Sequence, residues 1–131
     1  MNPSSAIRFL LIAFSFMLGE ATPHAQDKPT PAHFQIPATD DGLPGAGPIR
    51  RYDWFRKLWT ERRTAWAARV ERDRNAVVLL GDSITQGWGE DFSAWFPSIK
   101  IANRGISGDT SRGVLIRLRE DVLPLDPPAI V

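Results

Sequence analysis

Apolar residues recur at helical spacing over residues 52–74, and charged residues fill the remaining positions. The apolar stripe consists of Trp54, Phe55, Leu58, Trp59, Trp66 and Val70. Asp53 stands near the start, where a carboxylate satisfies free amides and the helix dipole, and Arg63 belongs to the polar faces. The pattern predicts an amphipathic helix. Because the aromatic residues share one face, packing against a core is favoured over a nucleic-acid or sugar platform.

Three short apolar runs predict buried strands. Residues 76–80 (AVVLL) are wholly apolar and end at Gly81, as in a strand covered on both faces of a parallel sheet. Residues 99–102 form a second candidate strand, which a glycine-rich turn over residues 104–109 follows. Residues 129–131 resemble the start of a third strand.

Two further helices are expected between these strands. Residues 90–96 predict a short helix that stops at Pro97. A longer helix should begin at Thr110 or Ser111, either of which can cap it, and run to about Val122. Its expected apolar face consists of Val114, Leu115, Leu118 and Val122. Strands that alternate with helices predict an α/β fold with right-handed crossovers.

The N-terminal residues have the pattern of an export signal. Arg8 precedes an apolar run over residues 9–18, and small residues stand at Gly19 and Ala21. We expect a signal peptide over residues 1–21, cleaved after Ala21 or, as second choice, after Ala25. The alternative is a membrane anchor, but ten apolar residues are about half of what a spanning helix needs. The sequence therefore predicts export to the periplasm or beyond, without a stable membrane span.

Residues 22–50 are rich in proline and glycine, which predicts an extended linker. The two histidines, His24 and His33, fall within this stretch and are interpreted as solvated loop residues. The folded domain is therefore expected over residues 51–131.

Composition narrows the functional classes. The 131 residues suit one domain, and 16 basic against 15 acidic residues give a net charge of +1. That balance gives no electrostatic reason to expect a nucleic-acid partner. Without cysteine, the chain has no disulfide, thiolate nucleophile or cysteine-ligated zinc, and two histidines make an imidazole metal site unexpected.

Two loops carry the candidate chemistry, and each follows a predicted strand. They cover residues 80–87 (LGDSITQG) and residues 103–110 (NRGISGDT). In an open parallel sheet, the loops at the carboxyl ends of the strands form the ligand crevice. Both loops should therefore open on the same edge if the two strands are neighbours.

The first loop can present the Ser83 hydroxyl at a strand-to-helix turn, beside amides that point toward an incoming oxygen. That geometry suits acyl transfer, and glycine in the second loop lets a backbone N–H approach the reacting atom. Gly81, Asp82 and Ser83 are also ordinary turn formers, so the tripeptide by itself is a weak signal. The Gly-x-Ser-x-Gly elbow, the Walker loop and the dinucleotide fingerprint are all absent from the sequence.

Taken together, residues 76–88 (AVVLLGDSITQGW) and 103–118 (NRGISGDTSRGVLIRL) resemble the first two conserved blocks of SGNH hydrolases, also called GDSL esterases. The branch most similar to them contains the platelet-activating-factor acetylhydrolase subunits and bacterial lysophospholipase/thioesterase enzymes. The resemblance spans about residues 76–131. It implies a flavodoxin-like three-layer α/β/α sandwich with a parallel sheet, incomplete in this chain.

The resemblance also implies roles for individual residues. Ser83 matches the family nucleophile, and its amide matches one donor of the oxyanion hole. Gly108 matches a second oxyanion donor, and Asp82 matches the motif aspartate, interpreted as support for the loop. No metal or organic cofactor is implied. The expected substrates are O-acyl esters, either acetylated carbohydrate or lipid acyl esters, and the oligomeric state is not indicated.

Two family blocks have no counterpart in this sequence. The third block, Gly-x-Asn-Asp, supplies an oxyanion asparagine, and the last, Asp-x-x-His, supplies the base and its orienting carboxylate. His24 and His33 precede Ser83, whereas the family base follows the nucleophile. Without a base, a serine hydroxyl is a poor nucleophile near neutral pH.

The sequence therefore predicts the N-terminal part of a secreted serine esterase, and this part should be inactive alone. We expect a fragment of a longer protein, or else an inactive truncated product. The alternative class is a non-catalytic exported interaction or glycan-binding module.

Overall fold

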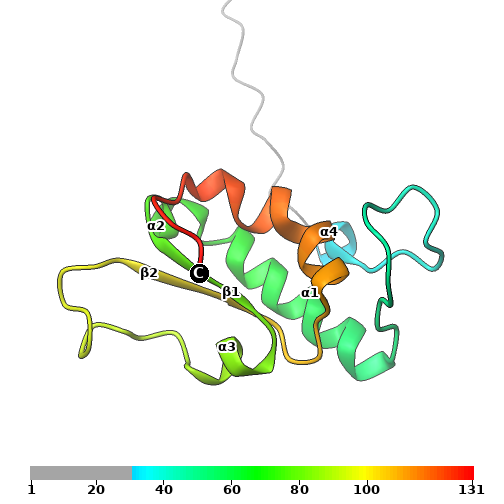
Figure 1. Cartoon of the computed structure of the whole chain (residues 1–131), viewed down its shortest axis with the longest axis horizontal. Coiled ribbons are helices and arrows are strands. Elements are labelled where there is room, and N and C mark those ends of the chain that lie inside the picture. The colour runs from blue at the N-terminus through cyan, green and yellow to red at the C-terminus, as the bar shows by residue number, and fades with distance from the viewer. Residues whose placement is uncertain (1–30) are drawn as a thin grey trace, which may run out of the picture.

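The computed structural model describes residues 31–131, and its elements alternate between helix and strand (Figure 1). The predicted signal peptide, the first part of the predicted linker and His24 lie outside the described residues. The elements are η1 (Pro31–Phe34), α1 (Asp53–Ala67), α2 (Val70–Asp73), β1 (Val77–Gly81), α3 (Ser83–Gly87), β2 (Ile101–Gly105), α4 (Ser111–Asp121) and η2 (Leu123–Leu125).

The strands β1 and β2 pair in parallel, from Val77 opposite Ile101 to Gly81 opposite Gly105. The end of the described chain returns to the other edge of β1, as Figure 1 shows near the label C. There the Val78 amide donates to Ala129 O at 3.0 Å, and Val78 forms a parallel bridge with Ile130. The α/β class is therefore confirmed. The strand expected at residues 129–131 is present only as this bridge, and its predicted burial is wrong, since Ile130 and Val131 are exposed.

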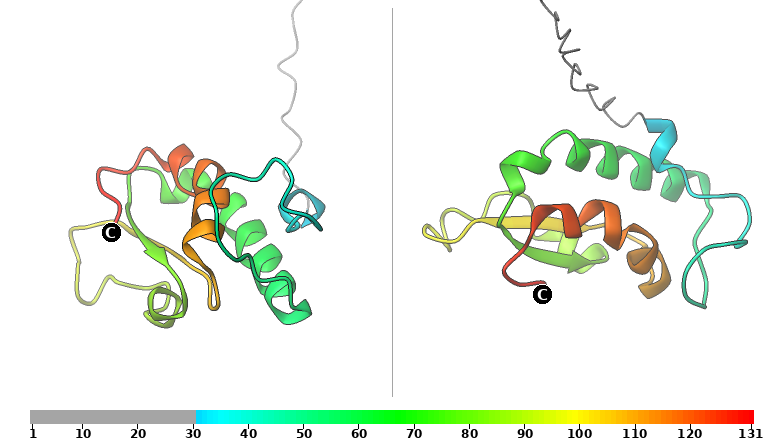
Figure 2. Two further views of the ribbon diagram at one scale, coloured as in Figure 1. Left: turned by 45° about the vertical axis from the view of Figure 1, so that its right-hand side comes forward. Right: turned by 90° about the horizontal axis from the view of Figure 1, so that it is seen from above.

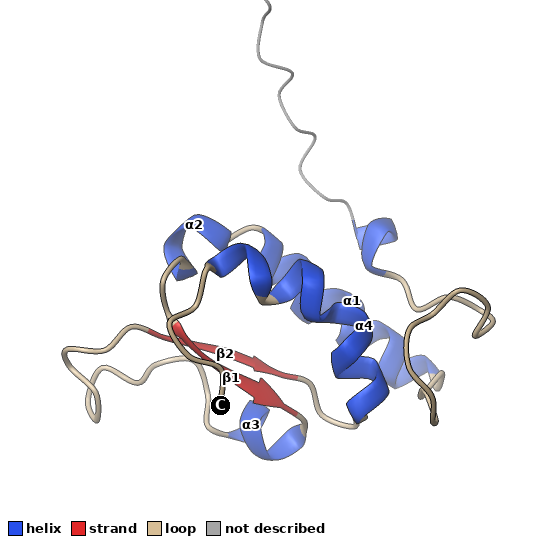
Figure 3. Cartoon of the chain, turned by 45° about the horizontal axis from the view of Figure 1, so that its top comes forward, coloured by secondary structure: helices blue, strands red, loops and turns tan. Residues whose placement is uncertain are grey.

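The helices α1 and α4 cover one face of the strands, whereas α3 lies on the other side (Figure 3). On the covered face, Val78 and Ala102 are buried in a cluster with Val122 and Leu125. A second cluster joins α1 to the chain before it and contains Phe55. Figure 2 shows α1 and α4 packed side by side above the sheet.

The single helix predicted over residues 52–74 is interrupted after Ala67. Arg69 leaves the helical conformation, with φ −126° and ψ 20°, and α2 begins at Val70. The interruption separates the two clusters: Trp66 belongs to the one around Phe55, whereas Val70 packs against the one around Val78. A continuous helix would keep both residues on one stripe, so the pattern did not reveal the break.

The helix α4 has the predicted bounds, and the Thr110 hydroxyl accepts a hydrogen bond from the Gly113 amide as its cap. Its apolar face was predicted wrongly in part, because Leu115 is 44% exposed. The buried residues of α4 are instead Arg112, Gly113, Arg117 and Asp121. Arg63 was also misplaced, since it lies on the buried face of α1 and pairs with a carboxylate of α4.

The short helix predicted over residues 90–96 is wrong, since this stretch forms turns and bends. The Asp91 carboxylate accepts from the Ser93 amide at 2.9 Å, and Phe92 O accepts from two amides, so local turns replace a helix. The strand β2 also begins two residues later than predicted, and it includes Arg104 and Gly105, which the prediction placed in the turn.

The described part of the proline-rich segment packs onto the domain. Phe34 and Ile36 are buried, and Ile36 O accepts from Arg56 Nη1 at 3.2 Å. Farther along, Arg112 Nη1 donates to Gly47 O at 3.0 Å and pairs with Asp40. Composition predicted the lack of strands here but not these contacts, which depend on side chains of α1 and α4.

Candidate functional site

Ser83 opens α3 directly after the end of β1, and its side chain is exposed. Asp82 caps this short helix, because its Oδ1 accepts a hydrogen bond from the Ile84 amide at 3.0 Å. The turn is tight: a β-carbon on Gly81 would lie 2.3 Å from Thr85 Oγ1. The local sequence therefore fixes the serine at the carboxyl edge of the sheet.

The second loop is hydrogen-bonded to the first. The Ile106 amide donates to Gly81 O at 3.1 Å, and the Ser107 amide donates to Gln86 Oε1 at 2.6 Å. Gly105 passes so close that a β-carbon there would lie 2.3 Å from the Gln86 nitrogen. The two predicted loops thus open on the same edge and contact each other, as parallel neighbouring strands require.

Gly108 adopts a conformation that favours glycine, with φ +83°. A β-carbon there would also lie 2.7 Å from Trp54 Cη2, at the start of α1. No main-chain carbonyl within residues 31–131 accepts a hydrogen bond from the amide of Ser83 or of Gly108. Neither of the amides singled out from the sequence is therefore committed to the main-chain hydrogen bonds of this edge.

Asn103 ties the strand β2 to the helix that carries Ser83. Its side-chain nitrogen donates to Thr85 O at 2.6 Å and to Gly89 O at 2.7 Å, and its Oδ1 accepts from the Gly105 amide at 2.8 Å. Neither Asn103 nor Gln86 was singled out by the sequence analysis. The available signal for Asn103 was its place as the first residue of the second loop, directly after the candidate strand.

Arg117 holds both loops from the helix α4. Its Nε bonds to Asp109 Oδ2 at 2.8 Å, next to Gly108, and its Nη2 donates to Gly81 O at 3.2 Å. Arg117 and Asp109 are both buried. Burial raises the pKa of Asp109, and the Arg117 cation and the Thr110 amide act in the opposite direction. The ion pair therefore positions the turns on either side of the candidate site.

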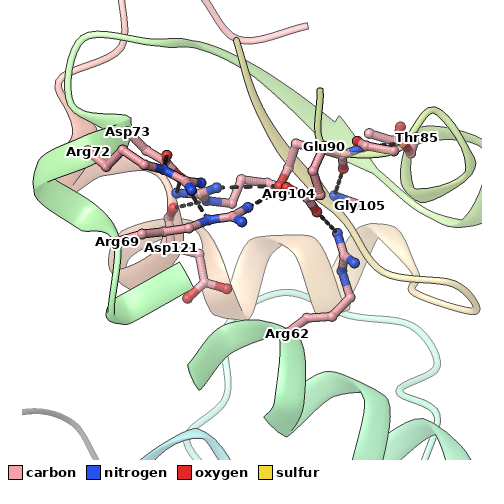
Figure 4. Close-up of polar contacts among 11 residues, drawn as sticks. Arg62, Arg69, Arg72, Asp73, Thr85, Glu90, Arg104, Gly105 and Asp121 are labelled. Atoms are coloured by element: carbon pink, nitrogen blue, oxygen red, sulfur yellow. Dashed lines mark hydrogen bonds and ion pairs between the residues drawn. The ribbon is translucent and has the colours of Figure 1, made fainter. Parts of the chain in front are cut away.

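A wider network of charged groups lies behind the strands (Figure 4). Arg104 Nη2 bonds to Asp73 Oδ2 at 2.9 Å, and its Nε donates to Asp121 O at 2.9 Å. Arg63 Nε bonds to Asp121 Oδ2 at 2.9 Å, and both Arg104 and Arg117 lie over the ring of Trp66. The network joins α1, α2, β2 and α4, so it fixes the strands that carry the loops.

His33 is the only histidine in the described residues, and it lies away from the serine. Its Nε2 is 3.5 Å from Glu120 Oε1, near the end of α4, whereas Ser83 follows the carboxyl end of β1. Within residues 31–131, no group of three acidic or imidazole side chains could hold a metal ion. Every helix in that range is too short or too polar to cross a membrane.

Comparisons with protein-family models, with curated proteins and with solved structures found no match for this chain.

Proposed function

We propose that this chain carries the nucleophile-bearing part of an SGNH-type (GDSL) serine esterase that acts on O-acyl esters. The observation that carries the proposal is the hydrogen-bonded pair of loops at one sheet edge. One loop exposes Ser83, and the other presents Gly108, whose amide is not used by a main-chain carbonyl of residues 31–131. Acyl transfer requires a nucleophile and amide donors for the oxyanion, and the two loops of this edge supply residues of both kinds.

The proposal includes a flavodoxin-like sandwich. β1 lies between β2 and the bridged residues 129–131, which gives the order second, first, third. That order begins a flavodoxin-like sheet, whose ligand lies where the strand order reverses. In the proposed sheet, Ser83 would lie at the point where the strand order reverses, because it follows β1.

In the proposed reaction, Ser83 Oγ attacks the ester carbonyl carbon while its proton passes to a base. The amides of Ser83 and Gly108 stabilise the oxyanion, the bond to the alcohol oxygen breaks, and the alcohol leaves with a proton. Water then attacks the acyl-enzyme and releases the acid. Asp82 supports the loop as the cap of α3. The described residues place no histidine beside Ser83, and the proposal takes the base from outside residues 31–131. Export through residues 1–21 is part of the same proposal.

The test is ester hydrolysis by the protein made from its complete reading frame. We expect turnover of p-nitrophenyl acetate, and we expect Ser83→Ala to abolish nearly all of it because no acyl-enzyme can form. Ser93→Ala, in the loop between α3 and β2, is the matched control and should keep the parental rate. Equal rates for the parent and Ser83→Ala would make Ser83 a turn residue. Such a result would favour a non-catalytic binding module instead.

A further inference from the structure

Two aromatic rings lie stacked and exposed at the start of α1. Tyr52 is 62% exposed and Trp54 is 54% exposed. Their ring centroids lie 6.4 Å apart, and the ring planes differ by only 9°. The sequence placed Trp54 on the core-facing stripe, but the structure leaves over half of it exposed. Two neighbouring exposed aromatic side chains offer ring faces to which a ligand can bind.

The backbone holds this aromatic pair in place. Tyr52 precedes the first turn of α1, and its carbonyl accepts from the amides of Phe55 and Arg56 at 3.0 and 2.9 Å. The Trp54 ring packs edge-to-face on buried Phe55, with centroids 5.7 Å apart. A ligand would therefore meet a surface that is already ordered, which lowers the entropy lost on binding.

The aromatic pair adjoins the second loop of the candidate site. A β-carbon on Gly108 would lie 2.7 Å from Trp54 Cη2, so the indole ring contacts the residue that offers the proposed oxyanion amide. Figure 2 shows the N-terminal end of α1 near the turn that follows β2. A hollow of about 320 Å³ lies next to Tyr52, and Arg50, Arg51 and Thr110 also line it. One ligand could thus contact the rings, the hollow and the reacting centre.

We propose that Tyr52 and Trp54 bind a sugar ring of an acylated carbohydrate, whose ester then lies over Ser83. The C–H groups of one sugar face pack on the faces of aromatic rings, whose π-electrons attract the positive edges of C–H bonds. The neighbouring Arg50 supplies donors for sugar hydroxyls, whereas Arg51 Nε and Nη2 already bond to Pro37 O and Asp40. The position of the ester over Ser83 rests on the proposed esterase function. The binding of a sugar ring to Tyr52 and Trp54 does not depend on it.

The charges beside the rings argue against the nearest rival ligand. A quaternary ammonium group also binds aromatic faces. It would have to lie beside Arg50 and Arg51, and Asp40 pairs with both Arg51 and Arg112. A hydrocarbon chain would offer no acceptor to the exposed Arg50 guanidinium that lines the hollow. A neutral polar ring suits this surface better than either.

The test measures binding separately from catalysis. The full chain carrying Ser83→Ala, which cannot turn over the ester, is run through native gels that contain acetylated xylan. We expect Tyr52→Ala with Trp54→Ala to weaken binding roughly tenfold, and Tyr52→Phe to leave it nearly unchanged because the ring remains. Trp95→Ala is the matched control, since Trp95 is 72% exposed in the loop between α3 and β2. The single variant Tyr52→Ala is included in case the double variant misfolds. Tyr52 is not among the residues that pack against Gly108, whereas Trp54 is, so its loss should disturb the second loop less.

Each outcome bears on one proposal at a time. Retardation that falls with both alanine variants but not with Trp95→Ala supports the sugar surface, even if Ser83→Ala does not lower esterase activity. No retardation of the parent, or equal retardation of all variants, overturns the sugar surface and leaves the esterase proposal to its own assay. Binding of acetylcholine that is lost with Tyr52→Ala would replace the sugar by a cation.

Discussion

At the residue scale, the least expected feature is a fully buried arginine that joins both loops of the candidate site. Arg117 is 0% exposed, and its partners are Asp109 and Gly81 O. Burying a charge is costly unless it is paired and hydrogen-bonded, so both groups depend on each other. The helical pattern of α4 suggested an apolar face, because pattern alone does not reveal where a charge will find its partner.

Arg117→Met should lower the free energy of unfolding by about 3–5 kcal/mol, because it leaves the Asp109 carboxyl buried without its partner. Urea denaturation measures the change. The double variant with Asp109→Asn should recover part of the loss, since the uncompensated charge is then gone. Losses below about 1 kcal/mol for Arg117→Met would show that the pair does not hold this region.

At the element scale, the break between α1 and α2 gives Asp73 a place among several arginines. Asp73 accepts hydrogen bonds from Arg104 and Arg72 at 2.9 Å, and its Oδ2 also lies 3.0 Å from Arg69 Nε as an ion pair. Burial by itself raises the pKa of Asp73, but the hydrogen bonds from Arg72 and Arg104 outweigh it and hold that pKa below its ordinary value. The short helix α2 is therefore fastened to β2 by a carboxylate that must stay ionised.

This arrangement predicts a pH dependence of stability. Because the folded-state pKa of Asp73 lies below the unfolded value, its contribution is present above about pH 4 and is lost as pH falls through the folded-state pKa. Asp73→Asn should lower stability at pH 7 and flatten its dependence on pH below about pH 4. Thermal unfolding across that range measures the effect, with Asp41→Asn as an exposed control. An unchanged slope would show that Asp73 does not contribute as inferred.

At the scale of the whole molecule, the segment before α1 completes the core. Phe34 and Ile36 are buried, and Ile36 joins the cluster of Phe55, Trp59 and Trp66. The Phe34 ring also lies 4.8 Å below the Arg63 guanidinium. These contacts make the described part of the proline-rich segment a covering layer over α1.

Phe34→Ala should therefore cost about 3–5 kcal/mol of unfolding free energy, as expected for removing a buried aromatic side chain. Leu123→Ala, at a position that is half exposed, should cost much less. Chemical denaturation of both variants gives the comparison. If the two variants were equally stable, the segment would be a linker, as its composition suggests.

The sequence by itself determined the order of elements around the two loops. Residues 76–80 and 129–131 are apolar runs that take part in the sheet, and the Thr110 side chain caps the helix that follows it. These are local properties, set by side-chain period and by hydrogen bonds to the nearest amides. The adjacency of the loops also followed, once parallel neighbouring strands were assumed.

Only the tertiary structure decided which polar residues are buried and where the exposed aromatics lie. Arg63, Arg104 and Arg117 are buried because acidic partners arrive from elements up to 58 residues away in the sequence. Helical spacing predicted that Trp54 packs in the core, but in the structure its ring contacts Gly108 and remains half exposed. Long-range pairing of charges and the close approach of backbones have no local period, so a pattern of hydrophobic positions does not contain them.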